Sequence, residues 1–291
     1  MLASAVIVFR EILEAGLVVG IVLAATKGVP RRGLWVGRGV VSGVAGACLV
    51  AAFAGQLASL FQGTGQELFN AGVLLVAVAM LAWHNVWMAG HGRDMAAAAR
   101  QLGAAVASGR RPLAALGFVC GVSVLREGSE IVLFLYGVAV SGDASAVSMM
   151  TGGAVGLLAG VALAGVVYLG LASVPIRHLF SVTAALITFL AAGLAAQSIA
   201  FLQQAGRAQM LTSTVWDSSW LLPEESLPGR LLHSLVGYTD RPTGAQLVVY
   251  LATVAAILGL MRLVGSRGRK VHRASPALRL PAQGSSAARD A

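Results

Sequence analysis

Long apolar runs, separated by short polar or Pro/Gly-containing links, dominate the pattern of this chain. Each run predicts a helix that crosses a membrane, because about 20 apolar residues span the hydrocarbon core of a bilayer. The runs cover residues 2–25, 34–60, 67–90, 113–140, 146–171, 179–203 and 244–264. We therefore expect an all-α, polytopic membrane protein whose seven transmembrane helices form one domain over residues 1–264.

Composition supports the membrane class. Hydrophobic residues make up 57% of the 291 residues, only 11% are charged, and the mean hydropathy is +0.80. An average soluble domain has about 25% charged residues, so a soluble fold is excluded. The first run has no basic segment before it and no small-residue cleavage site after it, and it predicts a retained helix rather than a signal peptide. Cys48 and Cys120 lie inside apolar runs without a CxxC pattern, which favours neither a disulfide framework nor a thiolate metal site.

Basic residues concentrate in particular links, which predicts the orientation. The links after runs one, three and five and the tail after run seven carry most of them, whereas the links after runs two and four carry none. By the positive-inside rule, the N-terminus lies outside and the C-terminus is cytoplasmic. The net charge of +9 therefore reflects orientation and not nucleic-acid binding. One long outer loop covers 204–243, and 265–291 reads as a disordered basic cytoplasmic tail that is solvated or contacts anionic lipid.

A charged motif, R-E-x-x-E, occurs in the middle of the first run and again in the fourth. An offset of 116 residues aligns Arg10 with Arg126, Glu11 with Glu127 and Glu14 with Glu130. Three runs separate the copies, so the two helices cross the membrane in opposite senses. Runs one to three and four to six are therefore expected to be inverted repeats, with a functional site where they meet near the membrane midplane.

Helical spacing places each Arg and its two Glu on one face, and insertion energies require that face to be buried. Three charged residues at a helix centre cost about 8–10 kcal/mol on the insertion scale. Pairing of Arg10 with Glu14, and of Arg126 with Glu130, at i, i+4 lowers that cost. One Glu per helix stays in excess, so a packed cluster demands protons or a hard cation. A purely structural salt-bridge role is the weaker interpretation, because intramembrane ionisable groups mark ion or proton pathways.

His84 is the remaining ionisable group deep in an apolar run. It is either an additional ligand or proton carrier facing the interior, or a hydrogen-bonded packing residue. The sequence alone favours packing.

The duplicated motif resembles that of the oxidase-dependent iron permease family, which has yeast and bacterial members. Weaker similarities are "QELF" at the head of run three, "WM" at Trp87 and Met88, "AAGLAAQSIAFLQQAG" in run six and "SLVGYTDRPTGAQLVVYL" entering run seven. The resemblance covers residues 1–264. It implies iron import across the cytoplasmic (inner) membrane of a bacterium, with iron as substrate and no cofactor.

The resemblance also implies particular residue roles. It makes Glu11, Glu14, Glu127 and Glu130 the iron ligands and Arg10 and Arg126 the motif arginines. Glu67 matches an acidic position at the outer end of run three, whereas Asn70 stands where the family often has a second Glu. Yeast members receive ferric iron from a partner oxidase and bacterial members have periplasmic partners, so we expect an extracytoplasmic oxidase or delivery partner.

Other functions remain open from the residues alone. Four carboxylates also suit another metal cation, such as manganese or lead. A membrane thiol or electron-transfer protein is less consistent with the pattern, because Cys48 and Cys120 do not occupy equivalent places in the two repeats. A non-transporting scaffold predicts that the charges only lock helix packing. The sequence favours a transporter over an enzyme and leaves the oligomeric state and the oxidation state of iron undetermined.

Overall fold

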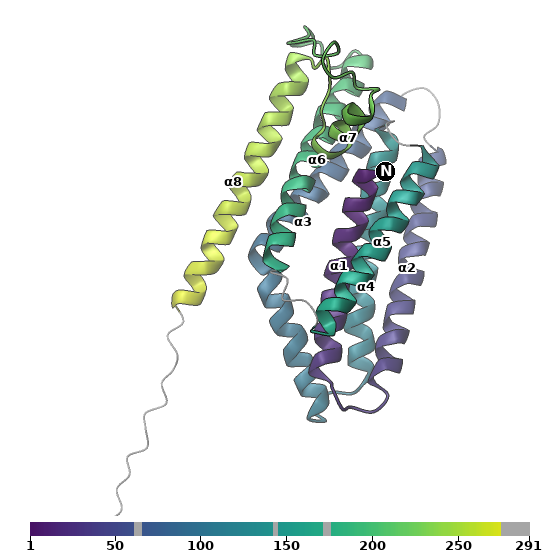
Figure 1. Cartoon of the computed structure of the whole chain (residues 1–291), viewed down its shortest axis with the longest axis vertical. Coiled ribbons are helices and arrows are strands. Elements are labelled where there is room, and N and C mark those ends of the chain that lie inside the picture. Colours follow the sequence, from purple (N-terminus) through teal and green to yellow (C-terminus); the bar gives the residue numbers. More distant parts are fainter. Residues whose placement is uncertain (61–65, 142–144, 171–175, 275–291) are drawn as a thin grey trace, which may run out of the picture.

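The structure is a computed structural model that describes residues 1–60, 66–141, 145–170 and 176–274. Its described residues form eight helices. These are α1 (Leu2–Ala25), α2 (Arg32–Leu60), α3 (Gln66–Ala107), α4 (Ala114–Val140), α5 (Ala146–Tyr168), α6 (Ile176–Gln204), α7 (Leu227–Val236) and α8 (Gly244–Ala274). The long helices run along the long axis of the molecule, and the short α7 lies at one end (Figure 1). The expected all-α class is confirmed for the described residues.

Five stretches are long and apolar enough to cross a membrane. They are Arg32–Ala54, Gln66–His91, Ala146–Tyr168, Phe180–Gln204 and Gly244–Val264. The helices α1 and α4 are also long, with 24 and 27 residues, but each carries an Arg and two Glu near its middle. The chain is therefore a multi-pass membrane protein, and the count of seven spans stays a prediction.

Helix pairing relates the two halves of the chain. α1 packs along α5 and α2 packs along α4, while α3 packs along α6 and α8 lies against α6 and α3. Under the repeat proposed from the sequence, α1 corresponds to α4, α2 to α5 and α3 to α6. The α1–α5 and α4–α2 pairs are then the same contact made twice.

Glycines make these two contacts close. A methyl group on Gly39 or Gly43 of α2 would collide with the carbonyl of Gly117 or Gly121 of α4, respectively. On α5, a methyl group on Gly152 would collide with the Met1 carbonyl and one on Gly156 with the Ala5 carbonyl. Met1 and Ala5 lie 116 residues before Gly117 and Gly121. Gly152, Gly156 and Gly160 are all buried, and small residues at this spacing allow helix backbones to approach.

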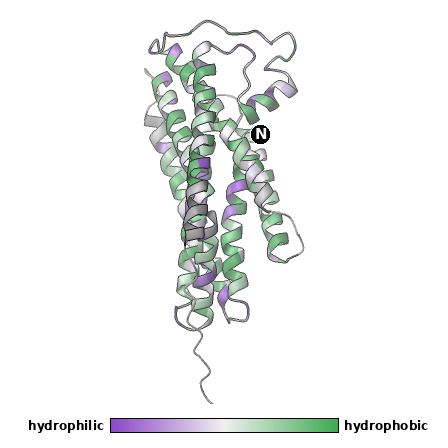
Figure 2. Cartoon of the chain, turned by 90° about the vertical axis from the view of Figure 1, so that its left-hand side faces the viewer, coloured by the Kyte–Doolittle hydropathy of each residue, from purple (hydrophilic) through white to green (hydrophobic). Residues whose placement is uncertain are grey.

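Two apolar clusters fill the core at different heights. One gathers residues from the first half of α1, the first half of α3, the second half of α4, α6 and α8, including Ile7, Leu81 and Phe134. The other joins the far end of α1 to α2, the end of α3 and the start of α4, through Val22, Leu116 and Cys120. Hydrophobic residues line most of the helix length, with hydrophilic ones at the bundle ends and at a few places along it (Figure 2). The motif residues fall between the two clusters along α1 and α4.

The segment expected to be one outer loop, 204–243, contains α7. Ser226 caps its first turn by accepting from the Gly229 N–H at 3.1 Å. Gly237 ends the helix in the left-handed region with φ of 70°, which glycine adopts without steric cost. The Tyr250 hydroxyl of α8 donates to the Val236 carbonyl at 2.6 Å and fixes α7 on the bundle.

The start of α1 lies near α7, and the described end of α8 lies far from α7 (Figure 1). α8 continues through 265–274, the first ten residues of the expected tail. The rest of that tail, 275–291, lies outside the described residues.

Candidate transport site

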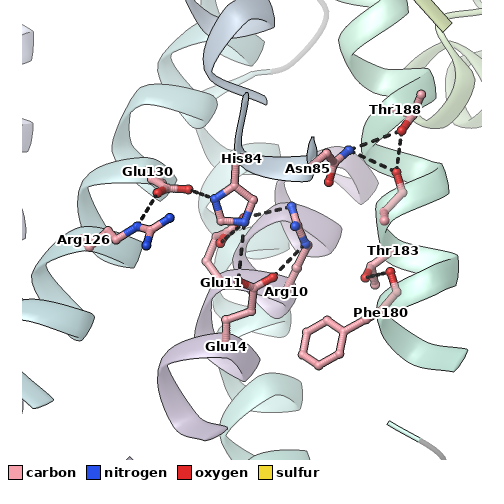
Figure 3. A network of polar contacts seen from close by, with 11 residues as sticks. Arg10, Glu11, Glu14, His84, Asn85, Arg126, Glu130, Phe180, Thr183 and Thr188 are labelled. Carbon is pink, nitrogen blue, oxygen red and sulfur yellow. Dashed lines mark hydrogen bonds and ion pairs between the residues drawn. The ribbon is translucent and has the colours of Figure 1, made fainter. Parts of the chain in front are cut away.

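Ionisable side chains from three helices meet between the two apolar clusters. α1 contributes Arg10, Glu11 and Glu14, α3 contributes His84, and α4 contributes Arg126, Glu127 and Glu130. Figure 3 shows the labelled side chains of α1 and α4 approaching His84 from either side. The predicted convergence of two motifs that lie 116 residues apart is therefore present in the fold.

Arg10 is buried against the two carboxylates of its own motif. Its side chain is only 2% exposed; Nε lies 3.0 Å from Glu14 Oε1 and Nη1 lies 3.5 Å from Glu11 Oε1. The predicted i, i+4 pair is confirmed. A buried ion pair of this kind offsets part of the cost of removing three charges from water, and it leaves α1 with one carboxylate in excess.

The second motif forms the same pair but holds its arginine differently. Arg126 Nε donates to Glu130 Oε1 at 3.1 Å, yet the Arg126 side chain is 35% exposed. Its guanidinium lies over the Trp87 ring, 4.4 Å from the ring centroid, a favourable cation–π geometry. The two repeats are thus alike in sequence and unlike in the environment of their arginines.

Glu127 has no counter-ion in the described part of the chain. Its residue is 2% exposed, and its Oε2 atom has no hydrogen-bond partner among the described residues. A buried carboxylate in this state is costly unless a proton or a cation accompanies it. With two arginines set against four glutamates, the ionised motifs would carry two net negative charges.

His84 occupies the centre of the cluster. Nε2 lies 3.4 Å from Glu14 Oε2 and 3.7 Å from Glu11 Oε2, and Nδ1 contacts Glu130 Oε2. The ring also meets Phe134 edge-on at 6.5 Å. The sequence favoured a packing role for this residue, but its two ring nitrogens face carboxylates of both motifs (Figure 3).

The next residue anchors this part of α3. Asn85 donates from Nδ2 to the Ala184 carbonyl at 3.2 Å and to Thr188 Oγ1 at 3.3 Å, both on α6. This contact is consistent with the rotation of α3 that turns His84 toward α1 and α4, and the packing of Leu74 and Leu81 in the core adds to it.

Four of these residues have the arrangement of a metal-binding site. Glu11, His84, Glu127 and Glu130 each offer one ligand atom, and these atoms lie within 4.8 Å of one another. Three carboxylates and one imidazole suit iron, manganese or zinc. Glu14, the fourth predicted ligand, is outside this group and contacts His84 instead.

The other predicted residues lie away from the cluster. Glu67 is exposed in the first turn of α3, 17 residues before His84 and hence about 26 Å away along the helix. Cys48 is exposed on α2, Cys120 is buried on α4, and both are free. Neither thiol belongs to the four-residue group.

A bundle of long apolar helices with a buried cluster of ionisable side chains at its core is typical of a membrane transporter. The chain matches the model of the iron permease FTR1 family over residues 1–273, and it belongs to that family. This result confirms the resemblance drawn from the duplicated motif.

Two relatives illustrate the similarity. The chain is 31% identical to the ferrous iron permease EfeU of Yersinia pestis over 248 residues. The aligned region is 84% of this chain and 87% of that protein. The chain is 30% identical over 248 residues to the ferrous iron permease EfeU of Escherichia coli O157:H7, covering 84% of this chain and 89% of that protein. No solved structure matches the chain.

Proposed function

We propose that this iron transporter moves its substrate through the cluster between α1 and α4, with Glu11, Glu127 and Glu130 as carboxylate ligands. Family membership supplies the activity, iron transport across a membrane. The observation that carries the site is the convergence of carboxylates from two distant motifs within 4.8 Å. Glu14 and Arg10 complete the charge balance on α1.

The excess negative charge explains why a cation would enter so apolar a bundle. Glu127 is buried without a counter-ion among the described residues. A divalent cation would neutralise the two excess charges and would replace its lost water ligands with carboxylate oxygens. The relatives are named ferrous iron permeases, and we take Fe²⁺ as the species bound.

The proposed topology has seven spans, with α1–α3 and α4–α6 as inverted repeats and α8 as the last span. Supporting it are the repeated α1–α5 and α4–α2 contacts, and the start of α1 near α7 with the described end of α8 far from α7. The distribution of basic links places the N-terminus outside and the C-terminus in the cytoplasm. We place the protein in the inner membrane of a bacterium, and an extracytoplasmic oxidase or delivery partner stays a prediction.

An apolar cluster lies on either side of the site along the bundle. Toward α7, the apolar cluster around Ile7, Leu81 and Phe134 covers it, and beyond that lies a cavity of about 30 Å³ next to Met1 and Gln197. Toward the other end, the cluster around Val22 and Leu116 covers it. Transport would therefore require each apolar layer to open in turn, as in alternating access.

Uptake of radiolabelled iron by a transport-deficient strain tests this proposal. Glu127→Gln keeps the size of the side chain and removes its charge, and we expect uptake to fall to background. Glu225→Gln, in the exposed outer segment, is the matched control and should keep full uptake. With equal amounts of protein in the membrane, full uptake by Glu127→Gln would rule out the assigned route.

A further inference from the structure

We propose that His84 is a nitrogen ligand of the transported iron and sets the selectivity of the site against Ca²⁺, Mg²⁺ and Mn²⁺. The inference rests on the proposed function, in which iron occupies the carboxylate cluster. It adds a third helix and a second kind of donor atom to a site otherwise made of the two motifs.

The placement of His84 supports a ligand role over a packing role. The residue is 2% exposed and lies on α3, outside both R-E-x-x-E motifs. Its ring nitrogens contact carboxylates on opposite sides, Glu14 and Glu11 through Nε2 and Glu130 through Nδ1. Carboxylates on both sides of the ring are the partners that a metal-ligating histidine or a charge-balancing one would have.

The surroundings also provide the support that a ligating imidazole needs. A metal-bound histidine uses the lone pair of one nitrogen and donates its other N–H to an acceptor, commonly a carboxylate. Whichever nitrogen of His84 holds the metal, the other faces a carboxylate. Glu14 lies 3.4 Å from Nε2 and is outside the four-residue group, so it fits the role of that acceptor. Phe134 and the Asn85 contact with α6 fix the ring.

The kind of ligand atom determines which cations bind more tightly to the site. Ca²⁺ and Mg²⁺ prefer oxygen ligands, and an all-carboxylate site would bind them along with iron. An imidazole nitrogen favours later transition metals, and affinity for a mixed site rises from Mn²⁺ to Fe²⁺. One histidine among three carboxylates therefore biases the site toward iron against these more weakly bound ions.

Metal competition on the purified protein in lipid nanodiscs tests this inference. Fe²⁺ binding under anaerobic conditions is competed with Mn²⁺ and with Ca²⁺ in the unmodified chain, His84→Gln and His91→Gln. Gln replaces the nitrogen donor with an amide oxygen. We expect His84→Gln to lower the preference for Fe²⁺ over Mn²⁺ and Ca²⁺ by about tenfold or more, the change that about 1.4 kcal/mol of differential affinity produces.

His91 is the matched control, because it lies two helical turns further along α3, is exposed and contacts Trp87 rather than a carboxylate. His91→Gln should keep the original preference. If His84→Gln binds all three cations more weakly by the same factor, His84 is a structural or charge-balancing residue and the inference is overturned.

A spectroscopic measurement on the unmodified chain covers the case in which His84→Gln fails to fold. With Mn²⁺ bound at saturating concentration, electron spin echo modulation should show a nitrogen-14 nucleus of a directly bound imidazole. Bound Mn²⁺ without that signal would overturn the inference. Glu127→Gln should lose the bound Mn²⁺; if Glu127→Gln keeps it with the nitrogen signal unchanged, the proposed carboxylate site fails instead.

Discussion

The two motif arginines occupy the same position of the R-E-x-x-E motif, but the structure predicts that they differ in their contribution to stability. Arg10 is 2% exposed and contacts two carboxylates at 3.0 and 3.5 Å. Arg10→Met keeps most of the side-chain length and removes the charge, which leaves Glu11 and Glu14 buried without their cation. Breaking a buried pair in this way costs about 3–5 kcal/mol.

Arg126→Met is the matched change in the second repeat and should cost much less. Arg126 is 35% exposed and makes one ion pair, at 3.1 Å, together with its contact on Trp87. A partly exposed pair and a cation–π contact are together worth about 1–2 kcal/mol. Taking the middle of each range, the two variants should differ by about 2.5 kcal/mol in the free energy of unfolding.

Thermal unfolding followed by tryptophan fluorescence measures this difference in detergent-solubilised protein. With roughly 2–4 °C per kcal/mol for a protein of this size, Arg10→Met should melt about 5–10 °C below Arg126→Met. Equal melting temperatures for the two variants would refute the conclusion that the repeats hold their arginines in different environments.

Three further predictions concern other parts of the fold. Gly156→Ala should destabilise the protein by about 1–3 kcal/mol and impair uptake, because the new methyl group meets the Ala5 carbonyl of α1. Gly165→Ala, on the same helix, meets nothing within 4 Å and should be neutral. Equal melting temperatures for the two variants would contradict this account of α1–α5 packing. Glu67→Gln should leave the iron affinity of the cluster unchanged in a binding titration, since Glu67 lies about 26 Å from His84 along α3; a weaker affinity would link it to the site. The Ser219 hydroxyl and backbone N–H donate to the Asp217 carboxylate, Arg241 lies adjacent, and together they hold the pKa of Asp217 below its usual value. The stability that this lowered pKa adds is present above the usual pKa of the carboxyl and is lost as pH falls through the lowered one. Ser219→Ala should therefore raise the Asp217 pKa in a carbon-13 NMR titration, and an unchanged pKa would count against the contact.

The helices and the motif pairs could be predicted because their causes are local. Apolar length determines where a membrane helix can form, and i, i+4 spacing brings Arg10 to Glu14 and Arg126 to Glu130 on any helix. Convergence of the two motifs followed from the energy of burying their charges. The helix α7 was not predicted, although Ser226 at its N-cap and Gly237 at its C-cap are recognisable start and stop signals.

The role of His84 and the unequal arginines could not be predicted, because both depend on tertiary neighbours. His84 lies outside the repeated motif, so no second copy indicates its role. The direction in which it faces cannot be read from the sequence, because a shift of one residue turns a helix face by about 100°. Its orientation toward α1 and α4 depends on how α3 packs, including the Asn85 contact with α6. The environment of Arg126 depends on Trp87 of α3, which no spacing within the motif reveals.

Location of bound iron tests the central claim most directly. An anomalous difference map at the iron absorption edge, from crystals of the protein grown with Fe²⁺ under anaerobic conditions, should show one peak among Glu11, His84, Glu127 and Glu130. A peak elsewhere in the bundle, with none between α1, α3 and α4, would contradict the account.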